Sequence, residues 1–154
     1  ISKLAGLSVP RTEELVGSLG THTDVVPGKD DELARLDYAL ACMAVDIAVG
    51  RHAGTIEETY SMLGQTFVQT GKDLSDVGQI VVTGGSLIHT EQTAQIAAYA
   101  TYDPAQPMSL RPKKADVLVA RQYILAAMGP LSTHVPKVAL SIMKKELECH
   151  GSSK

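Results

Sequence analysis

The sequence predicts an α/β domain that is rich in helices and contains a small sheet. Between residues 33 and 47, large apolar side chains recur at spacings of 3, 4, 3 and 4, which is the period of an amphipathic helix. Residues 80–82 are three consecutive β-formers that run into Gly84-Gly85, the pattern of a strand that ends in a tight corner. Residues 56–70 resemble a β-hairpin around Gly64.

Length and composition indicate one globular unit. With 154 residues, 44% hydrophobic and 20% charged, the chain is long enough to bury a core and ordinary for a soluble protein. It begins at Ile1, so we expect a fragment or a processed piece. Neither Cys42 nor Cys149 suggests a disulfide framework, and no signal peptide or membrane-spanning run is present. These features favour a cytoplasmic location and no membrane partner.

The charge is unevenly spread. The net charge is −3, but residues 1–103 hold 6 Lys and Arg against 14 Asp and Glu, and residues 104–154 hold 8 against 3. A negative total argues against nucleic acid as a partner. The acidic and basic parts either face each other as ordinary solvated surfaces or face a partner.

Three regions follow from the pattern. Residues 1–29 are expected to be a loosely organised N-terminal segment, with at most a short helix near Val9–Leu15 capped by Thr12 and a loop marked by Gly17, Gly20 and Pro27. Residues 30–150 form the main lobe. Residues 151–154 are expected to be a disordered tail.

The main lobe opens with a helix that Asp30 and Asp31 cap and that ends near Gly50. Its predicted buried face consists of large apolar residues: Leu33, Leu36, Leu40, Met43 and Ile47. The second half of the helix is expected to be covered on most sides. Asp46 is either a functional carboxylate or a paired buried acid. Arg51 and His52 either touch a ligand or satisfy the helix dipole.

Further elements follow the central strand. Thr90 is predicted to cap a helix over Glu91–Tyr99, and the Pro-rich connector 103–113 is expected to hold a short edge strand near Met108–Leu110. A helix rich in small residues is predicted over Ala115–Met128, with its end at Gly129-Pro130. A last helix is predicted to begin at Ser132.

The strand and Gly-Gly corner at residues 79–86 form the strongest candidate site. Thr83, Gly84, Gly85 and Ser86 follow the strand, and glycines let another group approach the backbone closely. A following helix would offer free N–H groups, which favours an anion or a nucleotide. The alternative is a tight turn without a ligand.

Metal and hydrolase chemistry find little support. The five histidines are scattered, and no pair has zinc-ligand spacing. Ser86 lies outside a Gly-x-Ser-x-Gly elbow, so no catalytic triad is expected. We therefore predict no catalytic residue and no metal ligand within these residues.

The order of motifs resembles the MutL family of accessory proteins of cobalamin-dependent glutamate (methylaspartate) mutase, in the actin-like (ribonuclease H-like) ATPase superfamily. Four blocks carry the resemblance: Arg51–Gly54, Gln69–Leu74, Val82–Gly85 and Tyr123–Gly129. It implies the C-terminal lobe of such an ATPase, whose Gly-Gly loop packs on the adenosine of ATP. Thr83, Gly84, Gly85 and Ser86 would then contact nucleotide, supported by the helix expected over Ala115–Met128.

The resemblance also implies partners and limits. The family is expected to act as an ATP-dependent chaperone or reactivating factor for the mutase subunits, with ATP and magnesium bound by the longer protein. The phosphate-binding hairpins and catalytic carboxylates of the superfamily would lie upstream, so this chain alone is predicted to need no cofactor and not to hydrolyse ATP. Alternatives are a non-catalytic interaction domain and a lobe of a small-molecule kinase.

One further expectation concerns assembly. If the first strands of the sheet lie upstream, the strand at Ile80–Val82 has an unpaired edge. Unpaired edges recruit other strands. A homodimer through this edge is therefore predicted.

Overall fold

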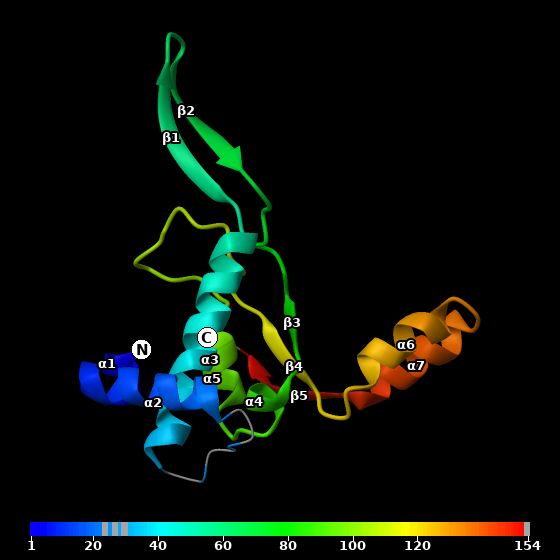
Figure 1. Cartoon of the computed structure of the whole chain (residues 1–154). Coiled ribbons are helices and arrows are strands. Elements are labelled where there is room, and N and C mark those ends of the chain that lie inside the picture. Colours follow the sequence, from blue (N-terminus) through cyan, green and yellow to red (C-terminus); the bar gives the residue numbers. More distant parts are fainter. Residues whose placement is uncertain (23–24, 26–27, 29–30, 153–154) are drawn as a thin grey trace.

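The computed structural model describes residues 1–22, 25, 28 and 31–152, the last five of them by their backbone alone. A small body is built from a long helix and a three-stranded sheet, and two arms project from it in different directions (Figure 1). The expected mixture of helices and small sheets is confirmed. The elements are α1 (Ser2–Ala5), α2 (Val9–Thr21), α3 (Glu32–His52), β1 (Thr55–Ser61), β2 (Gly64–Thr70), β3 (Gln79–Val82), α4 (Gly85–Ile88), α5 (Thr93–Ala98), β4 (Asp116–Ala120), α6 (Ile124–Ser132), α7 (Pro136–Glu146) and β5 (Leu147–Ser152).

The N-terminal segment is helical where the sequence predicted loose organisation. The side chain of Ser8 caps α2 by accepting the Arg11 N–H at 3.4 Å, and Pro10 fits the first turn, where no N–H is needed. Thr12 is not the cap, because it lies inside the helix and its hydroxyl donates to Ser8 O at 3.0 Å. Gly17 and Gly20 continue the helix rather than a loop, and Pro27 lies outside the described residues.

Helix α3 begins as predicted, but it buries a shifted face. Asp31 Oδ1 accepts the Ala34 N–H at 2.6 Å, which confirms Asp31 as the cap, while Asp30 is outside the described residues. The fully buried positions are Leu36, Ala39 and Cys42, at a spacing of three. Ile47 is 45% exposed, so the second half is less covered than expected.

The hairpin β1–β2 is confirmed and projects from the end of α3 (Figure 1). Its strands pair from Thr55↔Thr70 to Ser61↔Gly64, which leaves Met62 and Leu63 as a two-residue turn. The base of the hairpin is held by the connector, because Ile56 N–H donates to Met108 O at 2.9 Å and Leu110 N–H donates to Gly54 O at 2.8 Å. The short edge strand expected near Met108–Leu110 is therefore present as a bridge.

The second sheet has the order β3-β4-β5, with β3 parallel to β4 and β5 antiparallel to it. β4 corrects the helix predicted over Ala115–Met128. The run Val117-Leu118-Val119 is rich in β-branched residues and passes through the core, where Val117 and Val119 are fully buried, so tertiary burial favours a strand. Val82, Ile88 and Ala97 complete this core cluster.

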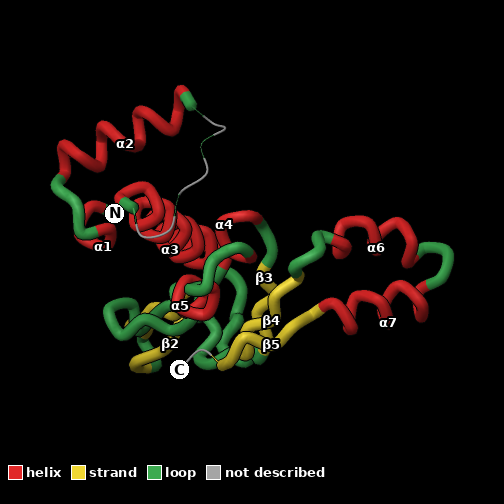
Figure 2. The backbone as a smooth tube through the Cα atoms, turned by 90° about the horizontal axis from the view of Figure 1, so that it is seen from below, coloured by secondary structure: helices red, strands yellow, loops and turns green. Residues whose placement is uncertain are grey.

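The segment after β4 forms an arm of two packed helices. The chain turns at Tyr123, whose φ is +57°, and α6 then continues through Gly129-Pro130, where the sequence predicted its end. Ser132 is the last residue of α6 and not the cap of the next helix. Figure 2 shows α6 and α7 side by side beyond the sheet and away from α3.

Two smaller expectations also differ. The helix predicted over Glu91–Tyr99 is shorter, since α5 covers Thr93–Ala98, and Thr90 Oγ1 accepts the Gln92 N–H at 3.1 Å just before it. β5 runs through Ser152, so half of the tail expected at 151–154 is strand, and residues 153–154 lie outside the described part. Within the described residues, no helix has the length and apolar character that a membrane crossing needs.

Candidate functional site: a hollow at the Gly-Gly corner

The corner after β3 has a backbone that requires glycine. Gly84 adopts φ +106° and ψ 147°, a conformation that residues with a Cβ rarely adopt. Its carbonyl oxygen accepts N–H groups from Leu87 at 3.0 Å and from Ile88 at 2.9 Å, which turns the chain directly into α4. The predicted strand and glycine corner are present, but the helix that begins at the corner itself, α4, was not predicted, and the helix expected from Glu91 is the separate α5. Helix α4 is only four residues long, so it supplies little of the expected dipole.

Helix α3 faces this corner across an open hollow of about 370 Å³. Most of the wall carries small or aliphatic side chains, so the hollow presents a smooth surface. The residues that line it are Asp37, Leu40, Ala41, Ala44 and Val45 of α3, with Gly84, Gly85, Ser86 and Leu87 from the corner. Two segments about fifty residues apart in the chain therefore build one site.

The polar groups of the hollow are one carboxylate and one hydroxyl. Ser86 Oγ donates to Asp37 Oδ1 at 3.3 Å, at the long end of hydrogen-bond geometry. None of the described lining residues is Lys, Arg or His. The hollow can accept hydrogen bonds from hydroxyl or amino groups and offers an apolar wall, but it carries no cation to hold a phosphate.

Of the four corner residues predicted to contact a ligand, the structure places three in the hollow. Gly84, Gly85 and Ser86 line it, whereas Thr83 is exposed on the approach to the corner and is not among the lining residues. A Cβ added at Gly85 would lie 3.7 Å from Tyr123 Oη, an ordinary contact. The helix expected over Ala115–Met128 to support the corner is absent, because residues 116–120 form β4.

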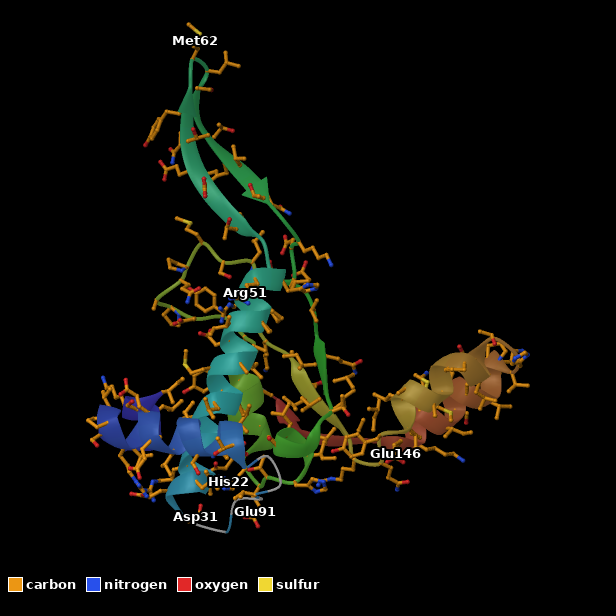
Figure 3. The ribbon with its side chains drawn as sticks, viewed as in Figure 1. His22, Asp31, Arg51, Met62, Glu91 and Glu146 are labelled. Carbon is orange, nitrogen blue, oxygen red and sulfur yellow. The ribbon has the colours of Figure 1, made fainter. Side chains whose placement is uncertain are left out.

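Arg51 and His52 lie at the opposite end of α3. Arg51 follows Asp37 by 14 positions, and at 1.5 Å per residue this separates them by about 21 Å along the helix axis. Figure 3 shows Arg51 beside the base of the hairpin, away from α4. Both side chains are exposed at the helix end, so the structure does not bring them to the Gly-Gly corner.

Asp37 is the site residue that sequence reasoning missed. A signal existed, because Asp37, Ala41 and Ala44 recur at helical spacing and put an acid and small side chains on one face of α3. The larger apolar stripe is the stronger pattern in this segment, and it overlaps the face of the hollow, because Leu40 belongs to both. Only the tertiary placement of α4 against α3 shows that Asp37 meets Ser86.

A second hollow of about 270 Å³ lies beside a buried ion pair. Arg111 is 3% exposed and its Nη1 donates to Asp46 Oδ1 at 2.6 Å, while Nη2 donates to Asp46 O at 3.0 Å. The sequence left Asp46 as either functional or paired, and the paired alternative is confirmed. Within the described residues, Arg111 Nε has no partner.

Burial also raises the pKa of two side chains on α3. Removal from water raises the pKa of Tyr38 to about 12, and a hydrogen bond with Cys42 adds to the shift. Burial likewise raises the pKa of the Cys42 thiol, which keeps it protonated and unreactive at neutral pH. No group of three His, Cys, Asp or Glu within the described residues could hold a metal ion.

Comparison with known proteins shows a match to one protein family. Residues 3–147 match the family described as MutL protein. The chain is also 37% identical, over 126 residues that make up 82% of its length, to Protein MutL of Clostridium tetanomorphum. It spans 27% of the length of that relative. No solved structure matches the chain.

Proposed function

The chain belongs to the MutL protein family, and from that premise we propose that it is the nucleoside-binding lobe of a longer ATP-dependent protein. That protein would act as a chaperone or reactivating factor for a cobalamin-dependent glutamate mutase. The mutase link rests on the family resemblance of the sequence blocks. The nucleoside part rests on the hollow at the Gly-Gly corner.

The composition of the hollow is the observation that carries the proposal. One face is made of the backbone at Gly84 and Gly85 and of small side chains on α3, which suits a flat heterocyclic base. Asp37 and Ser86 sit together and suit ribose hydroxyls, which carboxylates recognise well. Because the described part of the wall contains no Lys, Arg or His, the adenosine end of a nucleotide fits it better than the phosphates do.

ATP with magnesium therefore fits the hollow only in part. Asp37, Gly84, Gly85 and Ser86 would hold the nucleoside, while the phosphates and the magnesium ion would need groups that the lining residues do not include. When bound, ATP supplies the free energy of phosphate hydrolysis. The residues of this chain orient the nucleoside between α3 and α4, and we expect no steady ATP turnover by the chain alone.

In the proposed mechanism, this lobe moves when nucleotide binds or leaves. α3 carries Asp37 in the hollow and reaches the base of the hairpin at its other end, so a shift of α3 against the corner also moves the hairpin. Movement of the lobe would loosen the mutase so that inactive cofactor can leave. The mutase subunits are the partners in this proposal.

A homodimer through the edge of β3 is part of the same proposal. β3 pairs only with β4 within the described sheet, so its other edge is open, and Val81 is 49% exposed beside it. A second copy pairing there would extend the sheet. A mass in sedimentation that stays monomeric up to high concentration would count against this dimer.

A second candidate function is a non-catalytic interaction domain. The two arms favour it, because the hairpin and the α6–α7 pair both expose large apolar side chains away from the body (Figure 3). In that case the Gly-Gly corner would be a turn without a ligand. Binding experiments separate the two functions.

The test is calorimetric titration of the chain with adenosine and with ATP. We expect the two affinities to agree within about threefold, because none of the described lining residues carries a positive charge that would bind the phosphates. Asp37→Asn keeps the shape and removes the charge, and it should weaken adenosine binding by about tenfold or more. Glu91→Gln, an exposed acid away from the hollow, is the matched control.

Gly85→Val is the steric test of the same site. Gly85 has a negative φ and nothing closer than 3.7 Å to an added Cβ, so the fold should remain while the hollow fills. Adenosine binding should then be lost with an unchanged circular dichroism spectrum. Absence of binding in the unaltered chain, or binding that neither variant weakens, would overturn the nucleoside site and favour the interaction domain.

A further inference from the structure

The tip of the β1–β2 hairpin is apolar and exposed, and one face behind it carries exposed aromatic side chains. Met62 and Leu63 at the turn are fully exposed, and Tyr60 and Phe67 expose 77% and 60% of their surface. Large apolar groups in such a cluster are unusual on the surface of a monomer and mark contact sites. The hairpin is the part of the molecule farthest from the core (Figure 1).

The strand register shows which side chains lie on each face of the hairpin. Glu58 pairs with Phe67 and Tyr60 pairs with Gln65, so these side chains share a face with Ile56. The other face carries mostly hydroxyl side chains: Thr55, Thr59, Ser61, Thr66 and Thr70. On the first face the large apolar side chains alternate with the polar Glu58, Gln65 and Gln69. We call the apolar residues of this face and of the tip the docking face (Ile56, Tyr60, Met62, Leu63 and Phe67).

A lone two-stranded ribbon is marginally stable in water. Within the described residues, backbone hydrogen bonds and bridges tie this ribbon to the rest of the fold only at its base, through Met108, Leu110 and Lys72. Beyond that base, no other helix or strand of the described residues lies beside the ribbon (Figure 1). A ribbon of this kind becomes well ordered when another surface covers one of its faces.

The total surface also indicates a missing cover. The chain exposes 10,258 Å², whereas a compact monomer of 16.3 kDa exposes about 7,500 Å². The excess of about 2,800 Å² is of the size buried in extensive, permanent interfaces. The hairpin and the α6–α7 arm project from the body and contribute to this exposed surface (Figure 1).

We propose that the docking face is covered by the part of a longer MutL-family polypeptide that lies outside this chain. The matched relative has nearly three quarters of its length outside the match, because the chain spans only 27% of it. Such a segment is tethered to the same protein, so its effective concentration is high. The inference rests on family membership and does not require the nucleoside site.

The charges of the hairpin specify the chemistry of that cover. Residues 55–70 contain Glu57 and Glu58 and no Lys or Arg. Glu58 lies on the docking face itself, where Tyr60 Oη donates to its Oε1 at 2.8 Å. The covering segment should therefore offer an apolar socket for Met62 and Leu63, with Lys or Arg at its rim.

A second copy of the chain fits the docking face less well. Two hairpins packed face to face would bring their Glu58 carboxylates together, and like charges in contact oppose association. The α6–α7 arm is basic, but a contact between the hairpin of one copy and the arm of the next is heterologous and continues into filaments unless it closes into a ring. Intramolecular cover avoids both problems.

Hydrogen exchange tests the proposal without nucleotide. The amides of residues 55–70 would be followed in the 154-residue chain at two concentrations and, at the aligned positions, in full-length Protein MutL of Clostridium tetanomorphum. We expect exchange in the full-length protein to be at least about tenfold slower. The buried strand β4, which needs no outside cover, serves as the internal control and should differ much less.

Two results would overturn the proposal. Equally fast exchange of the hairpin in the full-length protein would show that no segment covers it. Protection that appears in the chain alone and grows with concentration would assign the docking face to a second copy. Because no nucleotide is present, either result leaves the nucleoside site to be judged by its own titration.

A chimera tests the residues themselves. In it, this chain replaces the matching quarter of the Clostridium protein, and Met62→Ser with Leu63→Ser removes the apolar tip. Exchange of the hairpin should accelerate by at least about tenfold. Thr59→Ser with Thr66→Ser, a cross-strand pair on the opposite face, is the matched control. Unchanged protection in the tip variant would contradict the proposal, and a chimera that does not fold leaves the decision to the comparison of the unaltered proteins.

Discussion

Arg111 Nη1 donates to Asp46 Oδ1 at 2.6 Å across 65 positions of the chain, and this pair fixes the connector to α3. The guanidinium also donates to the carbonyl oxygens of Asp46 and Tyr99. One buried side chain thus joins α3, the end of α5 and the connector that holds the base of the hairpin. Removal of this side chain should therefore destabilise all three segments.

Asp46→Ala is expected to lower the free energy of unfolding by about 3 kcal/mol, because it leaves the charge of Arg111 buried without its partner. Urea denaturation measures this change. Glu14→Gln, which removes one of the two exposed carboxylates that pair with Arg11, is the control and should leave the midpoint nearly unchanged. Equal effects of the two substitutions would contradict the assignment of Asp46 to a structural pair.

Gly50→Ala and Gly17→Ala should change stability in opposite directions, although both glycines lie inside helices. A Cβ at Gly50 would sit 2.6 Å from Arg111 Nη2, so the variant should lose about 1–3 kcal/mol through overpacking. A Cβ at Gly17 meets nothing within 4 Å, so that variant should gain about 0.5–1 kcal/mol from reduced chain entropy. Thermal unfolding of both variants checks the signs, and stabilisation by Gly50→Ala would be inconsistent with the Arg111 position.

Gly54→Ala should loosen the base of the hairpin. An added Cβ would contact Thr70 O and lie 2.7 Å from the carbonyl carbon of Gly71, where neither backbone can yield easily. We expect faster hydrogen exchange at the Ile56 and Leu110 amides, which bridge the hairpin to its neighbours. Gly78→Ala, with nothing within 4 Å and no positive φ, is the control and should leave both amides unaffected.

Alkaline titration should show that Tyr38 links stability to pH. Its pKa is raised to about 12 in the folded chain, chiefly by burial, while an unfolded tyrosine ionises near pH 10. Between these values the folded state holds the proton that the unfolded state has lost, so stability falls as the pH rises from about 10 to 12. Tyr38→Phe should reduce this slope in denaturation experiments, and an unchanged slope would show that other groups cause it.

The sequence predicted correctly those elements that depend only on residues close together in the chain. The Asp31 cap, the hairpin and the Gly-Gly corner depend on neighbouring residues, and all three are present. The helix predicted over Ala115–Met128 was wrong, because small residues suggested a helix while burial of Val117 and Val119 in the sheet selects a strand. A short apolar run such as residues 117–119 fits a buried strand or a buried helix equally well, and only its place in the whole fold decides between them.

The same limit applies to the candidate site. Gly84, Gly85 and Ser86 could be predicted, since a glycine corner after a strand is visible in the sequence. Asp37 could not, because its role depends on how α4 lies against α3. Arg51 and His52 were predicted to touch a ligand because they are basic, but they lie in the last turn of α3, far from the corner. No solved structure tests the actin-like lobe, which stays a prediction.

The order of the strands means that this sheet is completed late in translation. β4 lies between β3, which is made earlier, and β5, which follows only after the whole α6–α7 arm. A nascent chain that has not yet emerged past residue 146 therefore holds β4 with one edge open, at the centre of its most apolar core. During translation, the arm delays the closing strand, so the interval before β5 arrives is when this lobe is most exposed to aggregation and most in need of a holdase.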